Sequence, residues 1–371
     1  MQRFYFDHNA TTPVAPEVLD SMIPALADVY GNASSIHHYG QIAKQRLEMA
    51  RRQVAAFLGC DPRETVFVSG GTEADNLAIL GAAPKHAITT AIEHPAVLNT
   101  FAQLADVTVV PVGSDGVVDP DDIRRALRPG TSLISVMHAN NELGTVQPIE
   151  QIAAIAREAG VVFHVDGVQA AGKLPVNLRS LGADLYSISG HKLYAPKGIG
   201  ALFVRKGTPI HPIIFGGKHE HQRRAGTENV PGAVALGRAV ELPRHDESQL
   251  RDRLENGILE RVPNTGVNGS RAARVPNTTN IYFDGIEGEA MVIALDLKGF
   301  AVSSGSACSS GAVEPSHVLL AIGLSRDRAK SSLRFSLGRA NTVEQVDALI
   351  DAVAESAQHL RKLSPTYTAR V

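Results

Sequence analysis

The sequence predicts an α/β fold, with a large domain built on a mostly parallel sheet covered by helices and a smaller α+β domain. Up to about residue 240, short apolar stretches alternate with amphipathic helical stretches, as in parallel sheets with helices on both faces. Residues 242–249 are polar, and the spacing of strands and helices changes after them. The 371 residues are 44% hydrophobic, which is enough for about two domains and a large core.

Several elements of the large domain follow from their apolar pattern. Residues 40–59 are predicted to be a helix, because apolar residues including Leu47, Met49 and Val54 recur along one broad face and Gly59 suits a helix end. Strand, helix and strand within residues 131–166 predict a parallel pair joined by a crossover helix. The predicted elements are a strand, glycine turn and helix in 64–80, strands in 131–139, 161–166, 183–190 and 200–207, and a helix in 147–160.

The smaller domain is predicted to contain short strands and a long final helix. The strands are expected in residues 277–283, 299–304 and 331–337. The helix is expected at 342–363, where Thr342 and Gln345 occupy capping-box positions ahead of an apolar stripe. We assign residues 13–248 to the large domain, and residues 1–12 together with 249–371 to the small domain.

The charge balance excludes some partner classes. Lys plus Arg (36) nearly equals Asp plus Glu (38), so no overall field favours nucleic acid or an anionic membrane. The first 13 residues lack the apolar core of a secretion signal, and no stretch approaches the roughly 18 apolar residues of a membrane span. We therefore expect a cytoplasmic protein that binds neither nucleic acid nor membranes.

The cysteine and histidine patterns predict no metal site. The two cysteines lie far apart and have no zinc-finger spacing, and they are too few for a disulfide framework. His219 and His221 are two residues apart, but they lack an evident third ligand, so we expect no metal there.

The stretch SISGHKLYAPKGIG carries the strongest chemical signal. Lys192 follows an apolar strand that ends at Ser189, and open α/β sheets bind their ligands at this edge. A lone lysine is usually a solvated surface charge. Here the preceding strand ends in Asp166, and the two strand ends lie side by side if the strands are neighbours. An amine and a carboxylate so placed suit pyridoxal phosphate, which needs a Schiff-base lysine and an acid for its ring nitrogen.

A phosphate cradle is predicted in VSGGTEADN. Gly71 permits a close approach of the backbone, and Thr72 stands where a helix begins, so its hydroxyl and nearby N–H groups can face an anion. Ser189 and His191, beside the lysine, offer further donors. A plain strand-to-helix turn is an equal alternative for the glycine pair taken alone.

The stretch AVSSGSACSSG, residues 301–311, places a thiol among Ser and Gly. A structural cysteine usually behaves as a small buried apolar residue, which fits Cys60 in FLGCDP. Cys308 has little apolar cover in its own sequence, and its glycine neighbours permit large backbone excursions. We interpret Cys308 as a nucleophile on a mobile loop.

Motifs from residue 6 to residue 339 together resemble the cysteine desulfurases, in the class V aminotransferase group of fold type I pyridoxal phosphate enzymes. The resemblance covers nearly the whole chain in order, so it is more specific than any single motif. Its motifs are FDHNATTP, GNASSIHHYG, VFVSGGTEADN, EHPAV, HANNELGTVQPI, HVDGVQAAGKLPV, SGHKLYAPKGIGAL, RAGTEN, SSGSACSS and SSLRFSLGR.

The resemblance implies roles for individual residues. Lys192 is implied as the Schiff-base lysine, Asp166 as the partner of the pyridine nitrogen, His94 as the ring that stacks on the cofactor, and Gln169 as the donor to its phenolic oxygen. Asn141 is implied to contact cofactor and substrate, and Arg334 to bind the substrate carboxylate. Thr72, Ser189 and His191 match the phosphate ligands, Gly71 lies in the same turn, and Thr227 reaches in from a second subunit, so the family is homodimeric.

The resemblance also implies an activity. Sulfur would be removed from L-cysteine to give L-alanine and a persulfide on Cys308, which passes it to an acceptor such as an iron–sulfur scaffold or a tRNA-thiolation protein. Selenocysteine lyases and other class V enzymes share the lysine and the aspartate, so they stay as alternatives. An ordinary aminotransferase has no need for Cys308.

One segment departs from the family pattern. The family commonly has three glycines before a loop with glutamate and arginine, whereas this chain reads GGKHEHQRRAGT at residues 216–227. Lys218, His221 and Gln222 occupy the altered positions. The conformation of this loop is therefore not predicted from the resemblance.

Overall fold

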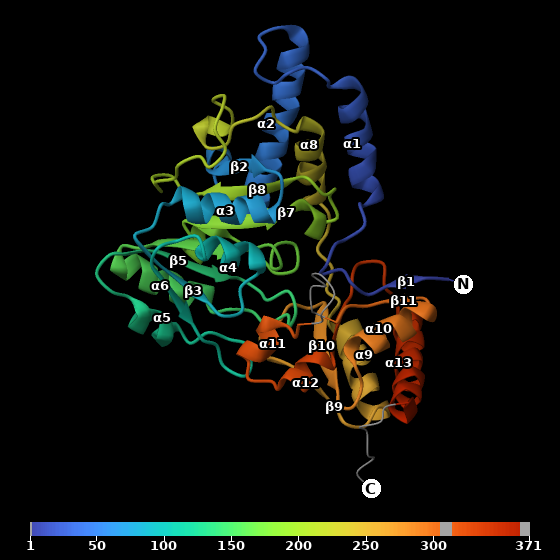
Figure 1. The fold of residues 1–371 in the computed structure, drawn as a ribbon. Helices are drawn as coiled ribbons and strands as arrows, with labels where there is room; N and C mark the ends of the chain where they lie inside the picture. The colour runs from blue at the N-terminus through green and yellow to red at the C-terminus, as the bar shows by residue number, and fades with distance from the viewer. Residues whose placement is uncertain (1, 305–313, 364–371) are drawn as a thin grey trace.

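The computed structural model describes residues 2–304 and 314–363 (Figure 1). A large sheet carries helices on both sides, and a second, smaller group of strands and helices is built mainly from the C-terminal part of the chain (Figure 1). The predicted α/β class is confirmed. The exact domain limits, 13–248 and 1–12 with 249–371, stay a prediction.

The large sheet is seven-stranded and mostly parallel, in the order β2-β8-β7-β6-β5-β3-β4. Neighbouring strands from β4 through β7 run parallel, whereas β8 is antiparallel to both β7 and β2. The pairing of β5 with β6 confirms the predicted parallel unit. The strands are β2 (Thr65–Val68), β3 (His86–Thr90), β4 (Val107–Val110), β5 (Thr131–Met137), β6 (Val162–Asp166), β7 (Leu185–Ser189) and β8 (Gly200–Val204).

Helices cover both faces of this sheet, because successive strand residues point to opposite sides. In β5, Leu133 packs in a cluster with residues of α3 and α4, whereas its neighbour Ile134 packs with residues of α2 and α6. The helices around the sheet are α1 (Pro16–Asp28), α2 (His38–Leu58), α3 (Gly71–Gly81), α4 (Pro95–Phe101), α5 (Pro120–Ala126), α6 (Ile149–Ala159), α7 (Leu178–Leu181) and α8 (Val230–Ala239).

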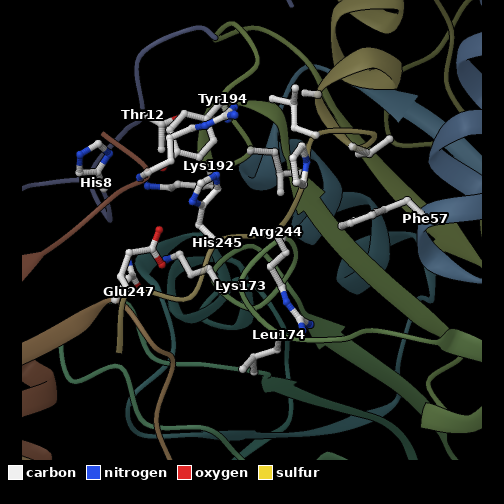
Figure 2. A pocket seen from close by; sticks show the side chains of 18 of the residues that line it. His8, Thr12, Phe57, Lys173, Leu174, Lys192, Tyr194, Arg244, His245 and Glu247 are labelled. Atoms are coloured by element: carbon white, nitrogen blue, oxygen red, sulfur yellow. The ribbon is translucent and has the colours of Figure 1, made fainter. Parts of the chain in front are cut away.

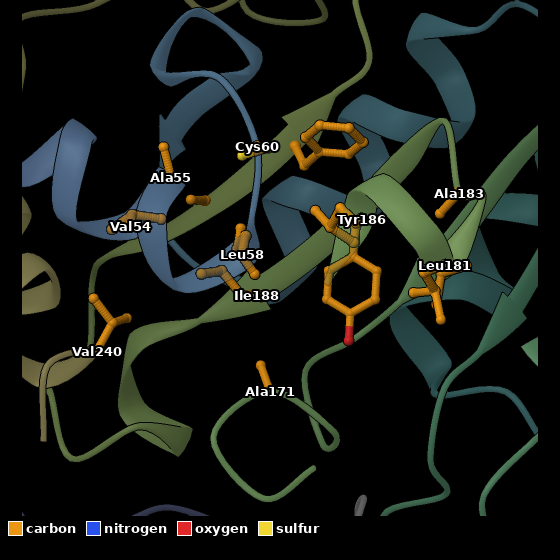
Figure 3. Close-up of a cluster of buried hydrophobic side chains, with 14 of the residues drawn as sticks. Val54, Ala55, Leu58, Cys60, Ala171, Leu181, Ala183, Tyr186, Ile188 and Val240 are labelled. Atoms are coloured by element: carbon orange, nitrogen blue, oxygen red, sulfur yellow. The ribbon is translucent and has the colours of Figure 1, made fainter. Parts of the chain in front are cut away.

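Tyr186 of β7 anchors the core beneath the functional edge of the sheet. Its ring is fully buried in a cluster with Leu58 and Ile188 (Figure 3). Its hydroxyl lies 3.0 Å from Nδ1 of His138. A Cβ atom on Gly167 would lie only 2.0 Å from the Tyr186 ring, so glycine at this position is what lets the ring pack under the end of β6.

The smaller group contains an antiparallel sheet in the order β12-β10-β9 and a parallel pair of β1 with β11. Its own apolar core includes Phe283, Phe335 and Leu349. The strands are β1 (Phe4–Tyr5), β9 (Thr265–Val267), β10 (Thr278–Phe283), β11 (Phe300–Ala301) and β12 (Ser332–Ser336), and the helices are α9 (Ser248–Arg261), α10 (Gly288–Leu297), α11 (His317–Ala321), α12 (Arg326–Lys330) and α13 (Val343–Leu363).

The predicted helix at 40–59 is confirmed as α2, but part of its predicted apolar face is wrong. Met49 is 44% exposed, whereas Arg51 is 3% exposed. The reason is an ion pair with a distant segment: Arg51 Nη1 and Nη2 donate to the Glu220 carboxylate at 2.7 and 2.8 Å. Glu220 also accepts from the backbone N–H of Phe67 in β2 at 2.8 Å.

The Arg51–Glu220 pair fixes the segment that departs from the family pattern. Glu220, His221 and Gln222 have φ angles of 44°, 57° and 66°, in the left-handed region that costs non-glycine residues energy. Since Glu220 is buried and hydrogen-bonded at both carboxylate oxygens, this pair holds the turn in place.

Within the described ranges, no helix is long and apolar enough to cross a membrane.

We predict that Glu220→Gln lowers the midpoint of thermal unfolding by roughly 5 °C or more. Removing the Glu220 charge leaves the buried guanidinium of Arg51 with the partly exposed Glu48 as its one ion-pair partner among the described residues, at a cost of about 3 kcal/mol. The matched control is Glu158→Gln, which removes the exposed partner of Arg124 and should shift the midpoint by about 1 °C at most. Equal shifts in the two variants, measured by circular dichroism, would contradict this role.

Candidate functional site

A pocket of about 410 Å³ lies at the edge of the large sheet where β6 and β7 end. The structure brings most of the predicted site residues together there. The pocket is lined by Gly71, Thr72, His94, Asn141, Asp166, Gln169, Ser189, His191, Lys192 and Arg334, together with Asn9, Ala10, Asp75, Met137, Val168 and Ser303.

Asp166 and Lys192 line one pocket because β6 and β7 are parallel neighbours, the condition under which the sequence predicts that the two strand ends lie side by side. Asp166 is the last residue of β6, and Lys192 ends a short 3-10 turn that follows β7. The Lys192 amine donates to the backbone carbonyls of Asn9 and Ala10, the latter at 2.7 Å. Burial, reinforced by the positive charge of Arg334, lowers the pKa of Lys192 to about 8. About a tenth of this amine is therefore neutral at pH 7, far more than of an ordinary lysine, and the neutral form is the one that a nucleophile or base requires.

The Asp166 carboxylate is buried at the floor of the pocket. It accepts the backbone N–H of Val168 at 2.9 Å. Burial raises its pKa, while that hydrogen bond and the nearby charges of His94 and Lys192 act in the opposite direction. Asp75 of α3 lines the same pocket, and burial together with the charge of Asp166 raises its pKa well above the usual value. A cationic ligand group beside Asp166 would favour its ionised form.

The start of α3 lies at this pocket, where the sequence predicted an anion cradle. The first N–H groups of a helix lack partners inside it, so they point at any anion placed there. A Cβ atom on Gly71 would lie 2.8 Å from Cγ2 of Val168, so glycine permits this helix start to approach the end of β6. Thr72, Ser189 and His191 line the same pocket. Burial, and after it the positive charge of Lys192, lowers the pKa of His191 to about 4, so this ring is neutral at pH 7.

His94 is the cap of α4 and stands exposed at the rim of the pocket. Its Nδ1 accepts the N–H of Ala96 at 3.1 Å, so the neutral ring carries its proton on Nε2. A flat ring held by a backbone contact is suited to stacking on a planar ligand.

Arg334 of β12 reaches the pocket from the smaller sheet. It donates to Asp7 at 2.6 Å and to the backbone carbonyl of Asn141 at 3.1 Å. Its Nε is buried and has no hydrogen-bond partner in the described part of the chain. A guanidinium held at the pocket with unused donor capacity is suited to a carboxylate ligand.

Two predicted residues are not in this pocket. Thr227 is exposed on the segment before α8 and does not line it. Cys308 lies outside the described residues, although Ser303, before it in the sequence, lines the pocket. Cys60 is buried, as predicted, and burial raises the pKa of its thiol to about 11.

Sequence reasoning missed Asp7, Asn9, Asp75 and Lys173 as members of the site. Asp7 pairs with Arg334, Asn9 bonds several pocket residues, and Lys173 donates to Gln169. All four lie inside the stretches FDHNATTP, TEADN and QAAGKLPV that carried the resemblance, so proximity in sequence to the assigned residues was the available signal. Among the residues with described positions, no group of three or more His, Cys, Asp or Glu is arranged to hold a metal ion.

A lysine amine, a buried carboxylate and a helix start in one pocket at the carboxyl edge of a parallel sheet define an α/β enzyme. Residues 4–349 match the aminotransferase class-V family, and the chain belongs to that family. Its relatives include proteins named cysteine desulfurase, which confirms the resemblance stated above.

Three relatives illustrate the match. "Cysteine desulfurase" of Nostoc sp. (strain PCC 7120 / SAG 25.82 / UTEX 2576) is 49% identical over 381 residues, covering 98% of this chain and 95% of that protein. "Cysteine desulfurase IscS" of Methanosarcina thermophila is 47% identical over 378 residues, covering 97% and 93%. A solved structure titled "NIFS-LIKE PROTEIN" has a TM-score of 0.91 and 37% identity, covering 97% of this chain and all of that chain (100%).

We predict that, in the full-length protein without ligand, Lys192 reaches half-maximal reactivity with acetic anhydride near pH 8, far below the 10.5 of an ordinary lysine. The Arg334→Met variant should move this midpoint upward, because the positive charge of Arg334 disfavours the ammonium form of Lys192. Competitive labelling read by mass spectrometry measures both, with exposed Lys197 as the internal comparison. A Lys192 midpoint near 10.5 would refute the assignment.

Proposed function

We propose that this enzyme is a cysteine desulfurase that uses pyridoxal phosphate to take sulfur from L-cysteine, releasing L-alanine and leaving a persulfide on Cys308. The observation that carries the proposal is the placement of Lys192 and Asp166 at the ends of adjacent parallel strands, in one pocket with an anion-binding helix start. The high identity to proteins named cysteine desulfurase over nearly the full chain supports it.

The residues present fit pyridoxal phosphate. Lys192 would bond covalently to its aldehyde, Asp166 would pair with the ring nitrogen, and His94 would stack on the ring. The phosphate would lie at the start of α3, where Gly71 permits the close approach of the backbone. Gln169 would donate to the phenolic oxygen and Asn141 would contact both cofactor and substrate. When bound, the cofactor would supply an electron sink for the carbon next to the amino group of the substrate.

Three side chains of the protein would carry out the remaining steps. Arg334 would hold the substrate carboxylate, and Lys192 Nζ would take the proton from the α-carbon and later return it. The Cys308 thiolate would attack the substrate sulfur, so that a sulfur–sulfur bond forms as the carbon–sulfur bond breaks. The three-carbon remainder leaves as alanine after protonation.

The proposal also covers the assembly and the acceptor. Thr227 is exposed and away from its own pocket, which is consistent with a role in the pocket of a second copy of this chain. We therefore propose a homodimer. The persulfide would pass to an acceptor protein of the iron–sulfur scaffold or tRNA-thiolation kind, in the cytoplasm, where reducing conditions keep the Cys308 thiol free.

We predict that Cys308→Ala abolishes persulfide formation and reduces alanine release by at least about tenfold. The second cysteine of the chain, Cys60, cannot replace it, because its thiol is buried and has a raised pKa. The measurement is alanine and sulfide release from cysteine in the presence of a reductant. Cys60→Ala is the matched control, and its activity should stay close to that of the unaltered enzyme since Cys60 is buried with a raised pKa. Alanine release that persists in Cys308→Ala would exclude the persulfide route.

We predict that Lys192→Ala removes the covalent link to the cofactor. After addition of pyridoxal phosphate and reduction with borohydride, the unaltered protein should gain the mass of one cofactor on the peptide that contains Lys192. Lys192→Ala should gain none, whereas Lys197→Ala, an exposed lysine nearby, should behave as the unaltered protein does. Attachment at a different lysine would overturn the assignment.

A further inference from the structure

Asn9 forms a buried junction between the two sheets. Its side chain is 2% exposed, and its amide nitrogen donates to the backbone carbonyl of Asn141 at 3.0 Å and to the hydroxyl of Thr278 at 2.8 Å. Its backbone carbonyl accepts from Gln169 Nε2 at 3.0 Å and from the Lys192 amine. The backbone carbonyl of Asn9 therefore bonds both Gln169 and Lys192, two of the residues predicted to contact the cofactor.

A second lysine, Lys173, bonds the side chains of both Asn9 and Gln169. Lys173 Nζ donates to Gln169 Oε1 at 2.6 Å and to Asn9 Oδ1 at 2.7 Å. A lysine amine needs an acceptor for each of these bonds, so both amide groups must turn their oxygen atoms toward Lys173 and their NH₂ groups away from it. Even a neutral amine keeps two N–H groups, one for each oxygen.

The orientation of Gln169 has a direct consequence for the pocket. One of its two amide N–H groups goes to the carbonyl of Asn9. No acceptor bonds the second N–H among the residues whose positions are described, and Gln169 lines the same pocket as Lys192 and Asp166. The second N–H is thus offered to an acceptor on the ligand.

We propose that Lys173 is a positioning residue for the cofactor, because its amine fixes the Gln169 amide so that an N–H faces the phenolic oxygen of pyridoxal phosphate. This role rests on the proposed function. If the amide of Gln169 were free to turn over, its carbonyl oxygen would face that anionic oxygen instead, and an attractive contact would become a repulsive one.

The surroundings of Lys173 are compatible with an amine that keeps donating hydrogen bonds to Gln169 and Asn9. Lys173 and Lys192 both line a second cavity of about 470 Å³, with the carboxylate of Glu247 close to Lys173 (Figure 2). Burial lowers the pKa of Lys173 well below the usual value, Lys192 and Arg334 reinforce this, and the Glu247 charge opposes it. The cavity gives the amine access to water and gives a longer side chain at this position room to fit.

The test compares full-length Lys173→Met with the unaltered protein. The variant should bind pyridoxal phosphate about tenfold more weakly in equilibrium dialysis, the expected effect of losing one hydrogen bond to a charged group. The visible absorbance band of the bound cofactor should also shift, because its phenolic oxygen loses a donor. Lys173→Arg, which keeps both donors, should restore the affinity and the band, and Lys197→Met, at an exposed lysine, should change neither.

A double-mutant cycle shows whether Lys173 acts through Gln169. In a Gln169→Met background, the further change Lys173→Met should weaken binding by less than about twofold, since the group that it orients is gone. A full additional tenfold loss would overturn the proposal. So would an unchanged affinity and band in Lys173→Met, or in Lys173→Leu, which also lacks a donor, if the methionine variant fails to fold.

The two proposals fail in different ways. If the unaltered protein takes up no pyridoxal phosphate, the proposed function is wrong. If it binds the cofactor and Lys173→Met binds it equally well, only the positioning role is wrong. A merely structural role would lower the unfolding temperature of the ligand-free variant and leave the absorbance band of the bound cofactor unmoved.

Discussion

The parallel pairing of β6 with β7 in the middle of the large sheet is the constraint on which the site depends. Their register sets Asp166 opposite Ser187, so the chain leaves both strands at the same edge. The short turn after β7 then brings Lys192 beside the end of β6. The anion cradle joins them because β8 begins against Gly70: a Cβ on Gly200 would lie 2.8 Å from the Gly70 Cα. The geometry of this one sheet thus places Asp166, Lys192 and the start of α3 beside one another.

The N-terminal segment carries the second constraint, since it ties the smaller sheet to this edge. Phe6 bonds β11 and β12 through its backbone, with Phe6 N to Ala301 O at 2.8 Å and Ser336 N to Phe6 O at 2.8 Å. Further along, Thr12 N bonds the carbonyl of His191 at 2.9 Å. The guanidinium of Arg334 is thereby held at a fixed place relative to the Lys192 amine. That proximity has an electrostatic effect, because the Arg334 charge contributes to the lowered pKa of Lys192.

The sequence was sufficient for the features that depend on local patterns. Apolar runs that end in an ionisable residue, such as the strand that ends in Asp166, predicted both the strands and the edge of the sheet at which the site lies. It was insufficient for β3 and β4, whose sequences HAITT and VTVV mix polar with apolar residues. Met49, predicted on the apolar face of α2, is exposed, and Arg51 is buried because Glu220, far away in sequence, supplies its partner. Asn9 and Lys173 are polar residues joined by a hydrogen bond between segments 164 residues apart, for which no local pattern exists.

The segment 216–227 illustrates how a departure from a family pattern can be compatible with its function. The altered residues Lys218, His221 and Gln222 are exposed, whereas Glu220 between them is buried and bonded to Arg51. The left-handed turn is therefore held by the glutamate and its partner in α2, whereas the exposed side chains of Lys218, His221 and Gln222 lie outside that buried pair. Because that anchor lies seven residues before Thr227 in the sequence, it limits where the threonine can be presented. The conformation of this loop is then tied to α2 by a buried carboxylate, in a chain that has Lys218 where the family commonly has a third glycine.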